Sequence, residues 1–483
     1  MRAALVQVEQ EGPVSEIARA VDADTGYSRS DLGNAQRFVA LYGDRVRYCY
    51  EQSAWLVSNG KRWIRDRTGE VERLAKKSVV AMAHEAANMT PAERDDFLAF
   101  ALSSQDRRRL DALIALARSE EGIAIETADL DRDPMLLNVL NGTVDLRTGT
   151  LRPHDPRDLI TKLAPVAFDP TARRELWIKT IDRTMGNDQE VIGFLQRSIG
   201  YAATGDISEH AIFILYGKGR NGKSTFLNTI LAILGDYATT IDASLLMSKA
   251  QDDHPTGLTD LEGRRFVPTA EAEDGRRFDE ALVKKLTGGE RIKARRMRQD
   301  FYEFMPSHKV FLAVNHKPRI KGTDEGIWSR IKLIPFNAFI PKEERIKDLD
   351  KQLAAEAPGI LAWIVQGCVE WQRIGLAEPK SIEDATNSYR DEMDNIGDFL
   401  RDRCLVPEQS HLKEVAKVKA SELYGAYVGW CKGTGTEPVA SRAFGSEMER
   451  RGFELKKSNS QAWRLGLTLN QDVDPDPVAY EIP

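Results

Sequence analysis

The spacing of hydrophobic and polar positions separates three regions along the chain. Between residues 30 and 170, apolar positions recur mainly at helical intervals, as at residues 105–118, where they fall on one helical face. Shorter stretches there have the pattern of strands, including a turn at Asn59-Gly60 between tryptophan-containing runs whose aromatic side chains we assign to core packing. These patterns predict a mixed, mostly helical N-terminal domain at 30–170, preceded by an N-terminal extension at 1–29.

A different pattern begins after two further helical stretches at residues 171–205. From 206 to 345, short continuous apolar runs alternate with helical patterns, which predicts an α/β fold with a mainly parallel sheet. The clearest runs, at residues 211–216 and 309–314, are predicted to be buried strands. Residues 346–395 are again predicted to be helical.

The region that follows, residues 396–468, has the pattern of a small separate domain. Two helical stretches are followed by two short strand patterns, at residues 453–457 and 462–467, which together would form a wing. Residues 469–483 are acidic and contain proline, and we predict that this tail is disordered.

Composition narrows the class of protein. The 483 residues carry a formal net charge of −6, so contact with nucleic acid would require a local basic patch. No apolar run approaches the roughly 18 residues needed to span a bilayer, and the N-terminus lacks the apolar segment of a signal peptide. The four cysteines lie far apart, without a CxxC pair or a metal-ligand spacing. We therefore expect a reduced, cytoplasmic protein without a structural metal.

Residues 217–224 read GKGRNGKS and match the pattern G-x-x-x-x-G-K-[ST] at every fixed position. The match lies between a predicted strand and a helix predicted over residues 223–234, which is the context that a phosphate-binding loop requires. In such a loop backbone N–H groups surround nucleotide phosphates, Lys223 reaches the β- and γ-phosphates, and the Ser224 hydroxyl ligates Mg²⁺. The residues assigned to nucleotide binding are Gly217, Lys218, Gly219, Arg220, Asn221, Gly222, Lys223, Ser224 and Thr225.

Two carboxylates follow another apolar run. Residues 264–270 lead to Glu271 and Glu273, although Pro268 interrupts the strand pattern. One carboxylate would join Ser224 in the Mg²⁺ shell, where we assign Glu271, and one would polarise the attacking water. Which glutamate polarises the water is left open, and so is the alternative that both are solvated loop residues.

A polar amide and an arginine follow the next predicted strand. Asn315 directly succeeds the run at 309–314, where it would hydrogen-bond the γ-phosphate or the lytic water. Arg330 follows fifteen residues later, where it would suit a finger that stabilises transition-state charge at the site of a neighbouring subunit. The alternative for Arg330 is a surface salt bridge.

A dense cluster of positive charge lies just before the predicted strand at 309–314. Residues 291–298 contain five cations, namely Arg291, Lys293, Arg295, Arg296 and Arg298. Charge of this density attracts phosphates, and Gly288-Gly289 permits a tight turn, so we predict a protruding hairpin. The alternative is a solvated charged face. The aromatic residues that follow, Phe301, Tyr302 and Phe304, are assigned to the core, with stacking platforms for bases as the alternative.

Taken together, these blocks resemble superfamily 3 helicases, and most of all the helicase half of the phage and plasmid primase-helicases that are related to poxvirus primase-helicases. The most specific likeness lies in residues 286–297, in residues 311–320 and in residues 322–331. The likeness extends over about residues 30–392, and more weakly over the C-terminal region.

The resemblance implies a P-loop AAA+-like core that binds ATP and Mg²⁺ between subunits of a ring, usually a hexamer, which moves 3′ to 5′ along one DNA strand. It implies an oligomerisation collar at 171–205 and a winged helix at 396–468 that binds DNA or a protein partner. The catalytic residues that it implies are Lys223, Glu271, Glu273, Asn315 and Arg330. The residues that it places in a DNA-binding hairpin are Lys293, Arg295, Arg296 and Arg298.

The chain departs from many proteins of this kind, in which a primase-polymerase domain precedes the helicase. Only about thirty residues precede the recognisable region, so we expect no priming activity. We expect a separate primase or polymerase as a partner, besides single-stranded and forked DNA.

The leading interpretation is a replicative DNA helicase of a phage, plasmid or mobile element in the cytoplasm of a bacterial host. The alternatives are an origin-binding initiator whose ATPase switches assembly without processive unwinding, and a P-loop ATPase that acts without nucleic acid.

Overall fold

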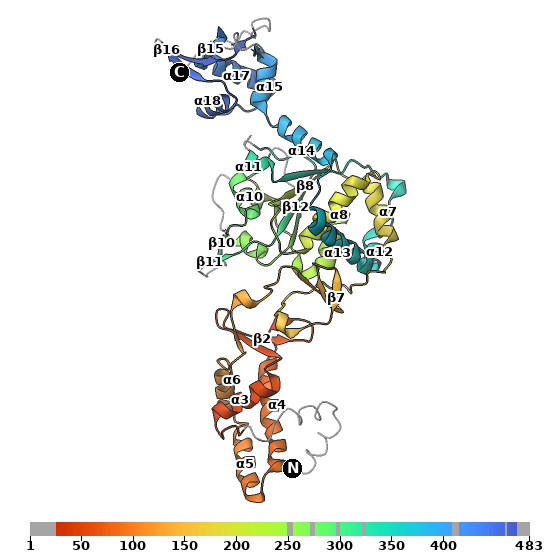
Figure 1. Ribbon diagram of the computed structural model, residues 1–483, viewed down its shortest axis with the longest axis vertical. Coiled ribbons are helices and arrows are strands. Elements are labelled where there is room, and N and C mark those ends of the chain that lie inside the picture. The colour runs from red at the N-terminus through yellow and green to blue at the C-terminus, as the bar shows by residue number, and fades with distance from the viewer. Residues whose placement is uncertain are drawn as a thin grey trace.

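The computed structural model describes residues 26–248, 255–270, 276–295, 300–320, 325–407, 415–458 and 461–470. Figure 1 shows an elongated molecule in which an N-terminal, a central and a C-terminal region follow one another along the longest axis. Within the described ranges, no helix is both long and apolar enough to cross a lipid bilayer.

Helices pack around a small sheet in the N-terminal region. Its helices are α3 (Asp31–Tyr42), α4 (Glu70–Glu85), α5 (Pro91–Ser103) and α6 (Arg107–Ala117), and its strands are β1 (Val46–Cys49), β2 (Ala54–Ser58), β3 (Trp63–Arg65) and β4 (Ala124–Ile125). The strands pair in the order β3-β2-β1-β4. The predicted hairpin is confirmed, because β2 pairs antiparallel with β3 around Asn59-Gly60, and Trp63 is buried in the core as expected.

Four parallel strands form the sheet of the central region: β8 (Ile212–Tyr216), β9 (Phe266–Ala270), β12 (Lys309–Val314) and β13 (Ile331–Pro335), in the order β13-β8-β12-β9. The two clearest strand predictions, at 211–216 and 309–314, are confirmed. β9 lies at the edge of the sheet, which explains why Pro268 is tolerated: a missing N–H costs least where a strand has a partner on one side only. The register pairs Tyr216 with Val314, so the carboxyl ends of β8 and β12 lie side by side.

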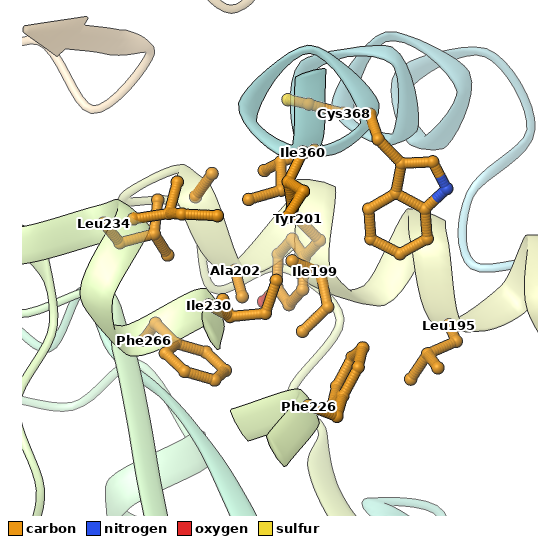
Figure 2. Packing of buried hydrophobic residues seen from close by; sticks show 14 of the residues in the cluster. Leu195, Ile199, Tyr201, Ala202, Phe226, Ile230, Leu234, Phe266, Ile360 and Cys368 are labelled. Carbon is orange, nitrogen blue, oxygen red and sulfur yellow. The ribbon is translucent and has the colours of Figure 1, made fainter. Parts of the chain in front are cut away.

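Alternate residues of these strands face two separate cores. Phe213 and Leu215 of β8 face a large core shared with α7 (Glu175–Thr184), α8 (Gln189–Ala203), α9 (Lys223–Leu234), α12 (Leu349–Ala355) and α13 (Ala357–Ile374). Figure 2 shows side chains of α8, α9 and α13 gathered there, among them Tyr201, Ile230 and Ile360.

Ile212 and Ile214 point to the other side of the sheet. Their core includes residues of α10 (Glu280–Thr287), β10 (Ile292–Arg295), β11 (Phe301–Phe304), α11 (Glu325–Trp328) and α14 (Lys380–Glu392). Because both faces of the sheet are covered, its strands read as continuous apolar runs, and this is why the sequence reveals them so clearly.

Two glycines allow α8 and α13 to cross at very short range. A Cβ added at Gly200 would lie 2.1 Å from the backbone N of Cys368, and one added at Gly367 would lie 2.2 Å from the carbonyl oxygen of Gln196. Most of α8 is therefore buried within its own chain. The collar role that the resemblance gives to 171–205 stays a prediction, and it would have to use the outer surface of these helices.

A second small sheet joins the large core. Strands β5 (Leu136–Val139), β6 (Gly142–Asp145) and β7 (Thr150–Arg152) pair antiparallel in sequence order. Leu137, Val139 and Val144 pack in the same cluster as α8 and α13. Residues assigned from sequence to the domain at 30–170 thus pack with the central region.

Two buried cations fix the C-terminal end of α8 to the start of the sheet. Arg265 precedes β9 and donates from Nη1 to the carbonyl oxygen of Ala203 at 2.9 Å. Lys309 begins β12 and donates from Nζ to the carbonyl oxygens of Thr204 and Asp206. Carbonyls at a helix C-terminus lack helical partners and carry partial negative charge, so these cations satisfy them.

The C-terminal module contains α15 (Asn395–Arg403), β14 (Cys404–Leu405), β15 (Lys417–Lys419), α17 (Ala420–Thr434), α18 (Ser441–Arg450), β16 (Leu455–Ser458), β17 (Gln461–Leu465) and β18 (Thr468–Leu469). The two helices and two later strands predicted from sequence are present, and β15 adds a strand to give the order β15-β17-β16. β18 pairs with β14 and extends to Leu469, within the segment assigned to the tail. Residues 471–483 lie outside the described part of the chain.

Candidate functional site

The loop that matches the phosphate-binding pattern lies between β8 and α9. Three residues take left-handed backbone angles there: Gly219 (φ +83°), Arg220 (φ +55°) and Gly222 (φ +85°). Gly222 caps the start of α9 without a side-chain hydrogen bond. The first N–H groups of that helix have no helical acceptor, so they are available to an anion.

Lys223 lies at the centre of this turn and is 6% exposed. Its Nζ donates to the carbonyl oxygen of Gly217 at 2.5 Å, to Oδ1 of Asn221 at 3.2 Å and to Oδ1 of Asn315 at 3.3 Å. Burial lowers the pKa of this ammonium. No carboxylate of the described residues lies within ion-pair distance of Lys223, so the site presents a positive charge held only by neutral oxygens.

The chain that follows β13 closes against the loop. Nδ2 of Asn221 donates to the carbonyl oxygen of Phe336 at 2.8 Å, and the carbonyl oxygen of Arg220 accepts from the N–H of Ile340 at 3.0 Å. A Cβ at Gly217 would lie 2.3 Å from the Phe336 oxygen, so the loop fits only with glycine at that position. The sequence did not predict a role for the segment after β13. This segment contacts the loop through backbone groups, which are the same for almost every residue type.

Asn315 comes from the neighbouring strand and reaches the same place. It follows β12 directly, and the pairing of β12 with β8 brings its amide to the Lys223 ammonium. The structure thus joins two residues that are 92 positions apart in the sequence. Ser224, in the first turn of α9, is exposed beside them.

The arrangement suits a triphosphate and a hydrated divalent cation. The buried ammonium and the unpaired helix N–H groups can donate hydrogen bonds to phosphate oxygens. The exposed hydroxyl oxygen can ligate Mg²⁺. The two carboxylates assigned to this chemistry, Glu271 and Glu273, lie outside the described residues. β9 ends at Ala270, immediately before the first of them.

Arg330 lies elsewhere. It immediately precedes β13, and its backbone oxygen accepts from the N–H of Ile212 at the amino end of β8. The loop of Lys223 follows the carboxyl end of β8, about 13 Å further along the strand. In this chain Arg330 instead donates to Thr287 Oγ1 at 3.1 Å and to the Gly326 carbonyl oxygen at 3.0 Å. Within this chain the structure therefore does not bring Arg330 to the loop of Lys223.

The basic segment forms the predicted hairpin. β10 pairs antiparallel with β11, and Figure 1 shows both at the margin of the central region. Lys293 and Arg295 alternate with buried Ile292 and Ala294, whereas Arg296 and Arg298 lie outside the described residues.

One of the aromatic residues of this hairpin departs from expectation. Phe304 is buried as predicted, but Phe301 is 51% exposed, so its assignment to the core is wrong. The reason is register: Phe301 pairs with Arg295 on the outward face of the hairpin. The cations of Lys293 and Arg295 lie 5.0 and 5.3 Å from the centre of its ring.

Three family models match the chain. Residues 35–186 match a family described as D5 N terminal like, residues 215–330 match a family of unknown function (DUF5906), and residues 391–471 match a family described as Poxvirus D5 protein-like. The two D5 matches lie on either side of the segment that contains the phosphate loop.

Related sequences and a solved structure agree with these matches. Two viral proteins named "Putative helicase" are similar in sequence. L207/L206 of Acanthamoeba polyphaga mimivirus is 27% identical over 59% of this chain and 33% of its own length. 121R of Invertebrate iridescent virus 3 is 23% identical over 62% of this chain and 35% of its own length. The chain therefore spans about a third of the relatives it matches. The apo structure of the NrS-1 C-terminal region (305–718) has the same fold, with a TM-score of 0.50 and 13% identity over 89% of this chain and 98% of that one. Segments on both sides of the central region thus match D5 families, and the chain is similar to D5-like primase-helicases.

Proposed function

We propose that this chain is the ATP-hydrolysing motor of a replicative DNA helicase that works as a ring of identical subunits. One observation carries the proposal: the buried ammonium of Lys223 lies in the turn between β8 and α9 and also contacts Asn315 at the end of the neighbouring strand. A γ-phosphate at this junction would meet both side chains. The helicase names of the viral relatives support the same activity.

Each residue of the site has a distinct task in this proposal. The N–H groups at the start of α9 and the Lys223 ammonium bind the phosphates, and Ser224 together with Glu271 holds Mg²⁺. The metal, when bound, neutralises charge between the β- and γ-phosphates. Asn315 orients the attacking water, and Glu271 or Glu273 accepts its proton. The strand order β13-β8-β12-β9 supports an AAA+-like P-loop core, because it places the loop strand next to the strand that bears Asn315.

The place of Arg330 supports an assembly with sites between subunits. Its guanidinium lies at the amino end of the sheet, remote from the phosphate loop of its own chain. An arginine that acts on hydrolysis from there must reach the loop of an adjacent copy, which is the geometry of a ring. We propose a hexamer, with the outer surfaces of α7 and α8 contributing to its collar.

The hairpin supplies the contact with DNA in this proposal. Lys293, Arg295 and the exposed ring of Phe301 share its outward face, and such a combination suits the phosphates and bases of a single strand. We propose that Arg296 and Arg298 extend the same contact. The C-terminal module, with two helices followed by a strand pair, is proposed to be a winged helix.

A fork-unwinding assay tests the proposal. The full chain is incubated with ATP, Mg²⁺ and forked duplexes that carry either a 3′ or a 5′ single-stranded tail, beside the matched variant Lys223→Ala. We expect displacement of the strand from the 3′-tailed substrate, and none with the variant, since it lacks the phosphate-binding ammonium. ATP hydrolysis that is neither stimulated by DNA nor coupled to displacement on either tail would contradict the proposal and favour an ATPase that acts without nucleic acid.

A further inference from the structure

One face of the C-terminal sheet combines lysines with a tryptophan. Trp463 lies on the central strand β17, and its neighbours across the sheet are Lys419 on β15 and Lys456 on β16. Lys417 lies on the same face, two residues before Lys419. The ammonium groups of Lys417 and Lys419 lie 5.1 and 6.0 Å from the centre of the Trp463 ring. We call the surface made by Lys417, Lys419, Lys456 and Trp463 the basic sheet face.

The opposite face of the same sheet packs inward. Val418 and Arg464 are paired across the strands and are 6% and 4% exposed. The guanidinium of Arg464 donates to the carbonyl oxygens of Gly445 and Phe453 and forms an ion pair with Glu449. Because successive residues of a strand point to opposite sides, this burial directs the basic sheet face away from the module's core.

Trp463 lies on the outward face of the central strand β17. The core of the module contains Phe399, Tyr427 and Phe444, and Trp463 is outside that cluster. Lys417 and Lys456 are exposed, whereas Trp463 is partly buried beneath the lysine chains. The indole of Trp463 therefore packs against lysine side chains at the surface and does not contribute to the core cluster.

The charge of this face is not neutralised within the module. Strands β15, β16 and β17 contain no acidic residue, and the described part of the chain places no carboxylate within ion-pair distance of the three lysines. The helix α18 differs, because its Glu447 and Glu449 pair with Arg450, Arg451 and Arg464. The acidic residues of that helix are thus engaged by arginines and do not neutralise the lysines of the sheet.

We propose that the basic sheet face binds single-stranded DNA as a second site, separate from the hairpin of β10 and β11. Lysine ammonium groups without a carboxylate partner attract the phosphates of a DNA backbone. An aromatic ring between them offers a stacking surface for an unpaired base. A paired base in a duplex hides its faces in the stack, so the tryptophan favours a single strand as the occupant.

Photo-crosslinking locates the site directly. The full chain, without nucleotide, is mixed with an oligothymidylate that carries 5-iodouracil, irradiated, digested and analysed by mass spectrometry. We expect a crosslink at Trp463, because the proposed stacking brings this ring against a base. Binding of the oligonucleotide with crosslinks that map only to the β10–β11 hairpin would overturn this second site while leaving the helicase proposal intact.

Affinity measurements on variants test the same face. Trp463→Ala is expected to weaken binding of the oligothymidylate about tenfold, whereas Trp463→Phe, which keeps an aromatic ring, retains most of the affinity. The triple variant Lys417→Ala, Lys419→Ala, Lys456→Ala is expected to lower the slope of log K against log salt by about 2.

The matched control is Lys457→Ala, an exposed lysine of the same strand whose partner Ala462 lies on the other face. It should change binding far less than Lys456→Ala. Equal losses for the two lysines, or a duplex that competes as well as the single strand, would overturn the proposal. Unchanged ATP hydrolysis in the absence of DNA verifies that each variant is folded.

Discussion

The chemistry proposed for this chain depends on contacts made by single residues at the carboxyl edge of the sheet. Lys223 and Asn315 contact one another although each follows a different strand, because the pairing of Tyr216 with Val314 places the two strand ends together. Neutral oxygens hold the ammonium in position, so a phosphate entering the site meets a charge that is already oriented. Pre-oriented charge of this kind costs no rearrangement when the reaction occurs.

The role of Asn315 is open to a direct test. In Asn315→Ala the ammonium of Lys223 keeps two of its three acceptors, so we expect ATP binding to persist. Hydrolysis should fall about 100-fold, the usual effect of removing one group that stabilises a transition state. Nucleotide affinity and turnover are measured beside His316→Ala, the exposed neighbour. Loss of binding in parallel with turnover would show that Asn315 holds the loop together and does not act in the chemical step.

A buried histidine should make the central region sensitive to acid. His308 is 3% exposed and neither ring nitrogen has a hydrogen-bond partner among the described residues. Burial, reinforced by the neighbouring Lys309 cation, lowers its pKa from 6.5 to about 3. Between these two values the unfolded chain binds a proton that the folded protein rejects, so stability is present above pH 6.5 and is lost as the pH falls.

From pH 7 to pH 5 this histidine should cost about 2 kcal/mol of unfolding free energy. Denaturant unfolding at the two pH values measures the loss, and His308→Leu should reduce it by that amount because leucine does not titrate. His84→Leu removes an exposed histidine and serves as the control. An identical pH response in His308→Leu and the unaltered protein would show that folding does not lower the pKa of His308.

At the scale of elements, the central region depends on the close crossing of α8 and α13. Gly200 and Gly367 bring the backbones together where a Cβ would meet backbone atoms, which cannot move aside as a side-chain end can. The crossing supports the sheet from one side, and Arg265 and Lys309 attach the end of α8 to the starts of β9 and β12. The loop of Lys223 therefore joins two elements, β8 and α9, that pack against this crossing.

Gly200→Ala should destabilise the protein by about 1–3 kcal/mol, although alanine favours a helix, because the added methyl overpacks the crossing. The control is Gly425→Ala in α17, where a Cβ meets nothing within 4 Å. That change should stabilise its helix by about 0.5–1 kcal/mol. Thermal or denaturant unfolding compares the two, and a neutral or stabilising Gly200→Ala would contradict the close crossing.

The sequence predicted these elements unevenly, and the reasons are physical. The runs at 211–216 and 309–314 and the helix at 223–234 are confirmed, since a strand covered on both faces must be apolar throughout and a phosphate loop has a fixed pattern. Phe301 was misassigned, because an aromatic residue beside cations has the same composition whether it faces inward or outward. The segment after β13 acts through backbone oxygens, which any residue supplies.

At the scale of the whole molecule, the separation of Arg330 from Lys223 is the decisive feature. They lie at opposite ends of the parallel sheet, so in the proposed mechanism one chain by itself would not supply both to the same nucleotide. The central claim is therefore that adjacent copies complete each other's sites. The hairpin and the basic sheet face would then be repeated around the assembly, each presenting cations to the same strand of DNA.

Mixing two inactive variants tests this claim most directly. Lys223→Ala lacks the phosphate-binding ammonium but keeps Arg330, whereas Arg330→Ala keeps the ammonium and lacks the guanidinium. A mixed assembly therefore contains some interfaces at which both groups are intact. ATP hydrolysis is measured at constant total protein while the ratio of the two variants changes. We predict no turnover for either variant alone and a maximum at intermediate ratios. Turnover that stays absent at every ratio, or Arg330→Ala that hydrolyses ATP normally by itself, would contradict the account.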